Sequence, residues 1–330
     1  RWRLVRPQRM DVAILLFALF GALMAWGLAA YHDRPWALLS LLAIPVALWL
    51  RERLAAAAAA VVVGSVILRL AYVGIGFTDQ IAVSQAGAAR AFSGLSPYGV
   101  GYAETVPPGA PFPYGPLALI WWLPGPAVEL LAAILLMALL IRERAWLTLG
   151  VFASVPFAVY LTTTGTNDYS PALLLAVGLV LMRSRPYLGA LTLAVAAALK
   201  PYGFAWLPSL IGYAGWRAGV AMIAASVVLW APVAVWGVGG FFRSLELSRL
   251  VHPIGENALN LPVLRFAAAL IAAAGLFAKR WEAAVLIGSA AFVVFLFLDR
   301  WASLGYWLAV GPISGIALER WAFAARAEPT

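Results

Sequence analysis

The chain has 330 residues, of which 64% are hydrophobic and only 11% are charged. A water-soluble domain carries about 25% charged residues, so this composition excludes an ordinary soluble globular protein. The absence of cysteine excludes disulfides and thiolate metal sites. The net charge of +9 does not indicate nucleic-acid binding, because Lys and Arg stand in short groups between apolar runs.

These long apolar runs, rich in Ala and Leu, predict an all-α, polytopic transmembrane helical bundle. Backbone polar groups in the hydrocarbon layer must be satisfied internally, so only helices or closed barrels cross it. The runs lack the ten-residue alternation of a barrel. About 12 helical spans are expected. They cover residues 11–31, 35–50, 54–76, 116–141, 145–163, 170–182, 186–199, 203–214, 218–238, 261–278, 283–298 and 301–318.

The N-terminal segment combines the basic stretch Arg1–Arg9 with the apolar run Val12–Ala30, a charge pattern that also occurs in signal peptides. The apolar run is about 20 residues long, the length of a full span, and a second run follows at once. We therefore expect a retained first helix.

Basic residues mark alternate ends of the predicted spans, and by the positive-inside rule these ends are cytoplasmic. They are Arg1, Arg3, Arg6, Arg9, Arg51, Arg53, Arg142, Arg144, Arg183, Arg185, Arg217, Lys279, Arg280, Arg320 and Arg326. Both termini are then cytoplasmic in a multi-pass plasma (inner) membrane protein. The long loops 77–115 and 239–260 are extracytoplasmic.

The segment 186–214 allows two interpretations. One long span would bury Lys200 near the centre of the bilayer, at a cost of about 3 kcal/mol or more. Two short helices that meet at Lys200-Pro201 avoid this cost and preserve the alternation of basic ends. The pair of helices is preferred.

The loop 77–115 is too long for a simple connection, and loops of this length are usually functional or disordered. Thr78 is a candidate N-cap for a surface helix over 79–92, which Gly94 ends. Asp79 would lie in the first turn. It either stabilises the helix dipole or takes part in chemistry at the membrane surface.

Three stretches resemble a known family: "ARAFSGLSPY", "FPYGPLALIWWLP" and "SRPYLGALTLAVAAALKPYGFAWLPSL". In this order they resemble the polyprenol-phosphate-dependent glycosyltransferases of the GT-C superfamily. The greatest likeness is to family 87, which is related to mannosyl- and arabinofuranosyltransferases. The likeness covers residues 54–262, as a GT-C-like catalytic module. Residues 1–53 add two N-terminal helices, and 263–330 form C-terminal helices with a short tail.

The resemblance implies an inverting glycosyltransferase of the cell envelope. It would move a hexosyl or pentosyl group, mannose or arabinofuranose, from a polyprenyl-phosphate donor to an extracytoplasmic glycolipid or glycan. Asp79 takes the role of the family's first-loop acid, the general base, which is worth about 10²–10⁴ in rate. No cofactor is expected. The partners are the donor, the acceptor and membrane lipids, without nucleic acid.

The loop "TTTGTNDYSP" matches a second family pattern, Gly-Gln-x-Asn, at Gly165 and Asn167 but departs from it at Thr166. Asp168 is either a second active-site acid or the cap of a helix that begins near Ser170, and capping is the preferred interpretation. Asn167 and Asp168 are candidate substrate contacts. The remaining candidates of this kind are Tyr98, Tyr114, Glu256 and Asn257.

Cations on the outer side are candidates for binding the donor phosphate. Lys200 either snorkels to the interface or supplies a point charge for the phosphate. Arg243 and Arg249 lie on an amphipathic helix predicted over 241–251, for which lipid headgroups are the simpler partner. The resemblance implies that His252 lies near the donor phosphate, either as a hydrogen-bond donor to it or as a proton carrier.

No metal site is expected, because His32 and His252, the two histidines, are far apart in the sequence.

Two further charges, Arg69 and Glu129, fall inside predicted spans, where they are costly unless paired or hydrated. From their depth we expect them to pair with each other. They are compatible with an alternative function as a transporter or lipid flippase. The third hypothesis is a non-catalytic membrane scaffold. This function would not require Asp79, Lys200 and His252 together.

Overall fold

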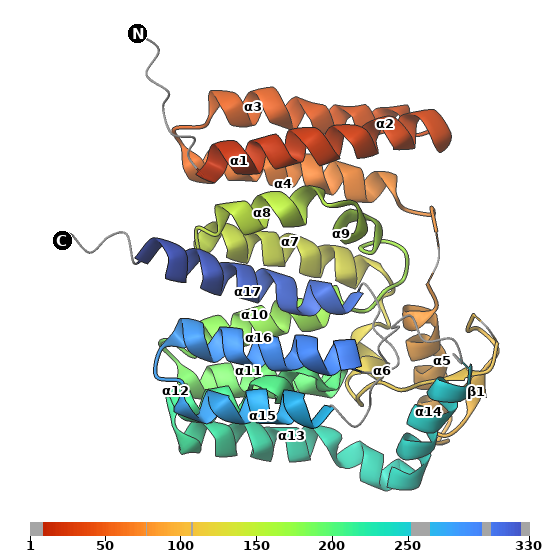
Figure 1. The fold of residues 1–330 in the computed structure, drawn as a ribbon. Coiled ribbons are helices and arrows are strands. Elements are labelled where there is room, and N and C mark those ends of the chain that lie inside the picture. Colours follow the sequence, from red (N-terminus) through yellow and green to blue (C-terminus); the bar gives the residue numbers. More distant parts are fainter. Residues whose placement is uncertain (1–8, 77, 107, 252–264, 299–304, 325–330) are drawn as a thin grey trace.

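The computed structural model describes residues 9–76, 78–106, 108–251, 265–298 and 305–324 (Figure 1). In these ranges the chain is helical apart from one short antiparallel pair, β1 (Gly101–Tyr102) and β2 (Ala110–Pro111). Among the described residues, three helices are long and apolar enough to cross a membrane: Arg9–Tyr31, Leu54–Ala71 and Trp216–Trp236. Several shorter helices are also apolar. The expectation of an all-helical, apolar fold is confirmed.

The N-terminal helices pack as one group on the rest of the bundle. Helix α1 (Arg9–Leu16) continues through the π-helical turn η1 (Phe17–Gly21) into α2 (Ala22–Tyr31). The chain returns through η2 (Pro35–Leu42) and α3 (Ala43–Trp49) to α4 (Leu54–Ala71). Small residues form the contact: a Cβ on Gly150 would meet Ala13 Cα at 2.6 Å, and Ser65 Oγ donates to Ala153 O at 2.6 Å. Close approach through small residues is typical of helices in membranes.

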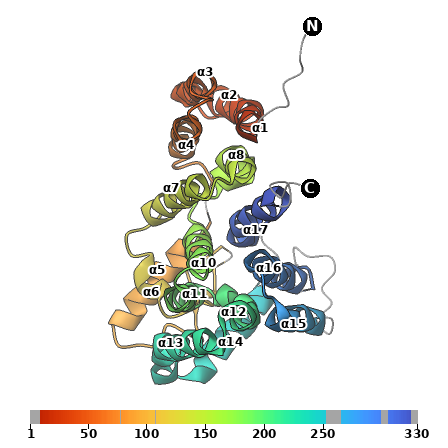
Figure 2. The same ribbon diagram turned by 90° about the vertical axis from the view of Figure 1, so that its left-hand side faces the viewer.

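Most of the remaining helices run side by side, as the end-on view in Figure 2 shows, while α5 and α14 lie across one end of the bundle in Figure 1. In chain order they are α5 (Gln80–Phe92), α6 (Ala118–Trp121), α7 (Ala127–Arg142), α8 (Trp146–Ser154), α9 (Pro156–Tyr160), α10 (Tyr169–Leu181), α11 (Pro186–Leu199), η3 (Pro201–Trp206), α12 (Leu207–Ala214), α13 (Trp216–Trp236), α14 (Val238–Val251), α15 (Arg265–Ala274), η5 (Gly275–Phe277), α16 (Trp281–Leu298) and α17 (Gly305–Ala324).

Two of the expected continuous runs are interrupted. The run 116–141 divides into α6 and α7 at a turn that contains Gly125, with φ of +80°. The run 145–163 divides into α8 and α9 at Val155, whose ψ of 128° is extended because Pro156 follows it.

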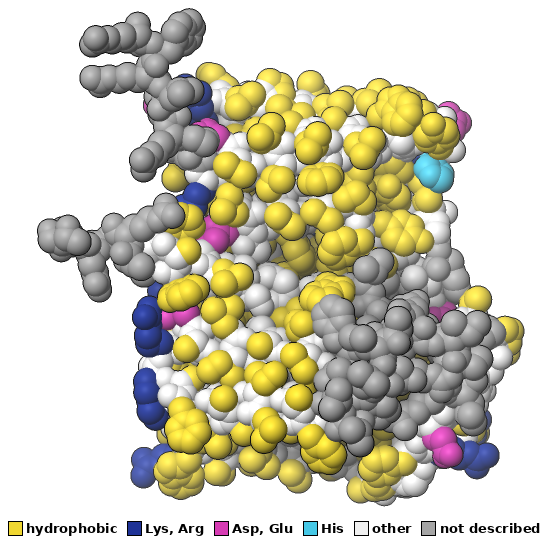
Figure 3. Space-filling model, in the orientation of Figure 1, with side chains coloured by type: hydrophobic (Ala, Val, Ile, Leu, Met, Phe, Trp, Pro, Cys, Tyr) yellow, Lys and Arg dark blue, Asp and Glu magenta, His cyan; other side chains and the backbone are white. Residues whose placement is uncertain are grey.

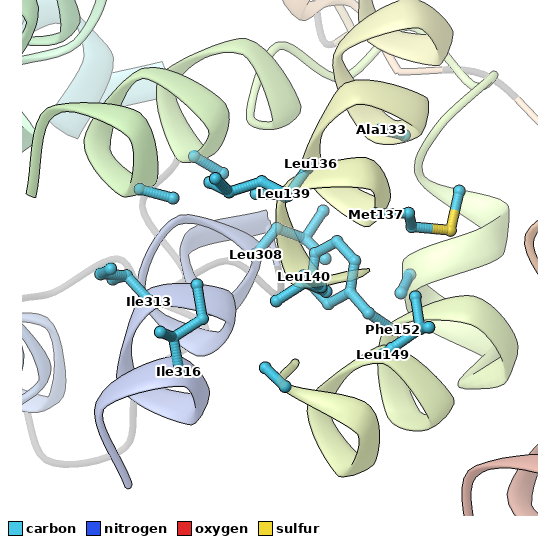
Figure 4. Close-up of a cluster of buried hydrophobic side chains, with 14 of the residues drawn as sticks. Ala133, Leu136, Met137, Leu139, Leu140, Leu149, Phe152, Leu308, Ile313 and Ile316 are labelled. Atoms are coloured by element: carbon cyan, nitrogen blue, oxygen red, sulfur yellow. The ribbon is translucent and has the colours of Figure 1, made fainter. Parts of the chain in front are cut away.

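Part of the main apolar core lies where α7, α8 and α17 meet (Figure 4). Leu136 and Leu140 of α7, Leu149 of α8, and Leu308 and Ile313 of α17 are fully buried there. This part of the core joins α7 and α8 to α17, which is far from them in the sequence.

The basic residues gather at one end of the bundle, the left-hand edge in Figure 3. Arg183 binds Glu143 at 2.6 Å, and Arg320 lies 3.7 Å from both Glu143 and Glu282. Arg9 lies 3.9 Å from Glu319. These ion pairs join α1, α7, α16 and α17. They lie at the end of the bundle whose basic residues are expected to face the cytoplasm.

The segment 186–214 is a helical hairpin, and the expected break at Lys200-Pro201 is confirmed. Helix α11 ends at Leu199, and η3 begins at Pro201. Lys200 between them is extended, with φ −138° and ψ 137°, as the residue before a proline favours. Lys200 thus forms the tip of the hairpin at the loop end of the bundle, opposite the basic end.

Candidate active site at the loop end of the bundle

Two loops that are distant in sequence are joined by backbone hydrogen bonds at the loop end. Thr78 N donates to Thr164 O at 2.6 Å, and Ile81 N donates to Gly165 O at 3.0 Å. The side chain of Gln80 adds a third link, because its Oε1 accepts from Asn167 N at 3.0 Å. These bonds fix Asp79 beside the turn that carries Asn167 and Asp168.

A third segment brings Tyr114 to the tip of the α11–η3 hairpin. Gly115 N donates to Leu199 O at 3.0 Å, and Leu117 N donates to Ala198 O at 3.1 Å. Gly115 is required for this approach, because a Cβ there would overlap Ala198 O. Tyr114 is therefore held directly beside Lys200.

Lys200 and Asp168 form a buried salt bridge at this junction. Lys200 Nζ lies 2.5 Å from Asp168 Oδ1, and the side chains are 3% and 0% exposed. Three tyrosine rings surround the ammonium, with centroids 5.2 Å (Tyr114), 5.5 Å (Tyr202) and 5.9 Å (Tyr306) from Nζ. Aromatic faces stabilise a desolvated cation, which compensates in part for its burial.

Tyr114 connects this ion pair with Asp79. Burial raises the pKa of Tyr114 well above its ordinary value, and the negative charges of Asp168 and Asp79 raise it further. The hydroxyl of Tyr114 therefore stays protonated. Its carbonyl accepts from Tyr98 Oη at 3.1 Å.

Asp79 occupies the N-cap position of α5, where Thr78 was expected, so the prediction for Thr78 is wrong. The Asp79 side chain makes no capping hydrogen bond. Instead, Oδ2 accepts the backbone N–H of Val106 at 2.8 Å, which ties α5 to the loop after β1. The carboxylate is only partly buried, at the rim of the site.

Asp168 does not cap α10 with its side chain, contrary to the preferred interpretation, because its carboxylate binds Lys200. Glu129 of α7 supplies the cap. Its carboxylate accepts from Tyr169 N at 2.6 Å, from Ser170 N at 3.3 Å and from Ser170 Oγ at 2.5 Å. Trp122 Nε1 donates to the same group at 2.7 Å. Glu129 thereby fixes the start of the helix that follows Asp168.

The expected ion pair between Arg69 and Glu129 is not present. The guanidinium of Arg69 is fully buried and donates to Thr162 Oγ1 at 3.0 Å and to Phe152 O at 2.9 Å, as well as to Ser65 Oγ. Depth in the bundle alone could not identify these partners. Both charges are satisfied by backbone groups, hydroxyls and an indole N–H from several different segments.

The other predicted site residues lie outside this cluster. Tyr98 is buried among Phe112, Trp236 and Phe241, and supports the loop. Arg243 is exposed on α14, a helix that is held to the loop by Gly99 N donating to Ser244 Oγ at 2.8 Å.

Arg249 lies on α14, but its side chain is outside the described part of the chain. His252, Glu256 and Asn257 also lie outside the described residues.

Three residues of the cluster were not predicted from the sequence. Tyr202 lies two positions after Lys200, and its hydroxyl is 3.4 Å from Asp168 Oδ1. Tyr306 comes from α17, and Gly305 before it leaves room for Asp168, because a Cβ there would overlap Asp168 Oδ2. The Lys-Pro-Tyr order could have indicated Tyr202, whereas no local pattern marks Gly305 or Tyr306.

The described residues contain no group of three or more His, Asp or Glu side chains that could hold a metal ion. The cluster can offer a carboxylate base at its rim, a lysine ammonium, a phenol and an amide, all without a metal. In comparisons with known proteins, the chain matches no protein-family profile, no curated protein and no solved structure.

Proposed function

We propose that the chain crosses the plasma membrane in about twelve helical passes, with the basic end in the cytoplasm and the loop end outside. The described helices follow the expected apolar runs and alternate in direction between the two ends (Figure 1). The ion pairs at the basic end join residues from four helices that the positive-inside rule assigns to one side.

We propose further that the protein is an inverting glycosyltransferase that uses a polyprenyl-phosphate sugar donor and an extracytoplasmic glycolipid or glycan acceptor. One observation carries this proposal: Asp79, Asp168 and Lys200 come from three separate segments and gather around Tyr114 at the loop end. The resemblance to GT-C enzymes had singled out the same segments.

The depth of the cluster also suits a lipid-phosphate donor. Helix α13 has 21 residues, whereas α10 and α11 have 13 and 14. At 1.5 Å per residue the shorter pair is about 10 Å shorter than α13. The tip that carries Lys200 is then recessed below the outer membrane surface, where a donor anchored in the bilayer presents its phosphate.

In the proposed reaction, the acceptor hydroxyl oxygen attacks C1 of the donor sugar from the face opposite the phosphate. Asp79 takes the hydroxyl proton as the new C1–O bond forms. The bond between C1 and the phosphate oxygen breaks, and polyprenyl phosphate leaves with the bonding electrons. One displacement of this kind inverts the configuration at C1.

Lys200 can assist departure of the phosphate although Asp168 already binds it. An ammonium has three N–H donors, and Asp168 Oδ1 occupies one of them. A second N–H can therefore bind a phosphate oxygen while Asp168 holds the side chain in place. Arg243, Arg249 and His252 remain proposed contacts of the same phosphate.

The alternative of a transporter or flippase gains no support from the intramembrane charges. Arg69 and Glu129 are fully buried and bind backbone groups and hydroxyls that hold helices together. Neither side chain is free to bind a transported solute.

The test is transfer of labelled sugar by the purified protein in liposomes, with polyprenyl-phosphate mannose and polyprenyl-phosphate arabinofuranose as donors. The parent should release one polyprenyl phosphate for each sugar transferred, and Asp79→Asn should lower kcat by about 10²–10⁴. Asp33→Asn is the matched control, because Asp33 is an exposed acid in another turn whose φ of 52° suits Asn. Full activity of Asp79→Asn would remove Asp79 as the base, and no release by the parent would refute the function.

A further inference from the structure

The side chain of Asn167 is fully buried, yet neither its Oδ1 nor its Nδ2 has a hydrogen-bond partner in the described part of the chain. The Tyr114 hydroxyl lies beside this amide and is the group with which the amide interacts, whereas the amide oxygen Oδ1 is left without a partner among the described residues. A buried amide without partners is rare, because the lost hydration is not replaced. A group of this kind in the centre of a polar cluster is a candidate for binding a polar ligand.

Asp168 presents a second unfilled position next to it. Its Oδ1 binds Lys200, while Oδ2 has no partner and the side chain is 0% exposed. The hydroxyls of Thr78 and Thr164, in the two loops that are joined here, are also buried and unpartnered. Unfilled donors and acceptors are therefore concentrated at one place in the fold.

The charge at this place decides which ligand fits. Among the described residues, the cluster holds two carboxylates, Asp79 and Asp168, against one ammonium, Lys200. The unfilled atoms of Asn167 and Asp168 are two carbonyl-type acceptors and one N–H₂ donor. This set suits hydroxyl groups, which donate to the carboxylate and the amide oxygen and accept from the amide nitrogen. An anion would meet the free oxygen of Asp168.

We propose that Asn167 and Asp168 Oδ2 form a subsite for adjacent hydroxyl groups of a neutral sugar ring, a proposal that rests on the glycosyltransferase function above. The sugar is either the one that is transferred or the terminal sugar of the acceptor, because both present the same hydroxyls. The salt bridge to Lys200 fixes the carboxylate, and the Gln80 bond to Asn167 N fixes the backbone of the amide.

Binding is measured on the purified full chain in nanodiscs by saturation-transfer NMR, without any donor. The probes are methyl α-mannopyranoside and methyl α-arabinofuranoside, with inorganic phosphate as the anionic comparison. At least one glycoside should bind with a Kd on the order of 1 mM, the range of a few hydrogen bonds. Analogues that lack one ring hydroxyl should bind about tenfold more weakly when the missing group is one that faces Asn167 or Asp168.

The variant Asn167→Ala should weaken glycoside binding by about tenfold or more. Ser93→Ala should bind like the parent, because Ser93 is exposed at the end of α5 and its hydroxyl donates to the helix carbonyl of Ala89, away from the subsite. The deoxy series uses the parent alone, so it remains decisive if Asn167→Ala does not fold. Unchanged binding by Asn167→Ala, equal binding of all deoxy analogues, or no glycoside binding by the parent would each overturn the subsite.

Competition between the glycoside and the lipid-linked donor then shows whether the subsite binds the transferred sugar or the acceptor sugar. Displacement of the glycoside by a polyprenyl-phosphate sugar, but not by polyprenyl phosphate alone, places the transferred sugar in the subsite. Simultaneous binding of glycoside and donor places the acceptor there. Because the assay involves no transfer, loss of binding in Asn167→Ala is distinguishable from loss of catalysis in Asp79→Asn.

Discussion

Lys200 Nζ lies 2.5 Å from Asp168 Oδ1, with both side chains almost completely buried at the tip of the α11–η3 hairpin. Their segments are 32 residues apart. The pair joins the start of α10 to the end of α11, and the rings of Tyr114 and Tyr202 extend the junction to the outer loop and to η3. Removal of either member would leave the other as a buried charge without its partner.

The first prediction concerns this pair. Lys200→Met or Asp168→Asn alone should destabilise the protein by about 3–5 kcal/mol, because each leaves a buried charge without its partner. The double variant should recover a large part of the loss. Thermal unfolding in detergent measures the change. Arg280→Met is the control, since Arg280 is 65% exposed and lies 3.9 Å from Glu282, which predicts an effect of about 0–1 kcal/mol. If the loss of stability in the double variant equalled the sum of the two single losses, Lys200 and Asp168 would not stabilise each other.

The second prediction concerns the cap that Glu129 provides for α10. Glu129→Ala should lower the unfolding free energy by about 1–3 kcal/mol, because the N–H groups of Tyr169 and Ser170 are left buried and unpaired. Glu129→Gln should cost less, since Gln keeps one acceptor oxygen. Glu104→Ala, at an exposed position of the outer loop, is the control and should be neutral. If both Glu129 variants were neutral, the cap would not determine the start of α10.

The third prediction compares two glycines of α17. A Cβ on Gly305 would overlap Asp168 Oδ2, whereas a Cβ on Gly311 would meet nothing within 4 Å. Gly305→Ala should therefore displace the carboxylate from Lys200, at a cost of about 1–3 kcal/mol for overpacking, and should abolish glycoside binding. Gly311→Ala should be neutral or slightly stabilising, because Ala favours a helix. Melting temperatures and the NMR assay check both, and equal effects of the two variants would contradict the prediction.

The sequence predicted those features that local rules control. The all-helical fold follows from apolar runs and low charge, and the hairpin at Lys200 follows from the conformation that a residue before proline adopts. The resemblance singled out Asp79, Asn167 and Lys200 as separate site residues, and the role of each stays a prediction. These features depend on neighbours within a few residues or on the order of the motifs that carry the resemblance.

The sequence could not predict which distant groups meet. Asp168 immediately precedes a helix, so local rules favoured capping, but Lys200 offers a full charge 32 positions later. The N–H groups at the start of α10 are instead bound by Glu129, which lies 40 residues before Tyr169. Tyr306 and Gly305 belong to α17 and lie beside Lys200 and Asp168. No pattern in the sequence predicts that α17 contacts the outer loops. In each case tertiary packing overrode the local preference.

The fourth prediction concerns the turn that joins the two outer loops. Gly165 has φ of +95°, and a Cβ there would lie 2.6 Å from Thr78 O. Gly109 has φ of +100° with open space around its Cβ position. Alanine at either position pays a similar conformational cost, about 1–2 kcal/mol. Only Gly165→Ala should also separate Asp79 from Asn167, which lowers transfer activity much more than Gly109→Ala does. Equal losses of activity would show that the contact with Thr78 has no role in positioning Asp79.

The fifth prediction tests the orientation of the bundle, and the absence of cysteine in the chain makes the test direct. Ser93 is exposed at the loop end, and Ser184 is exposed between α10 and α11 at the basic end. A membrane-impermeant maleimide added to intact cells should label Ser93→Cys and leave Ser184→Cys unlabelled until the membrane is opened. The opposite result would place Asp79 and Lys200 in the cytoplasm, where water-soluble nucleotide sugars are the available donors. The orientation therefore decides whether the site must take its sugar from a lipid, and labelling from one side separates the two cases without any knowledge of the substrate.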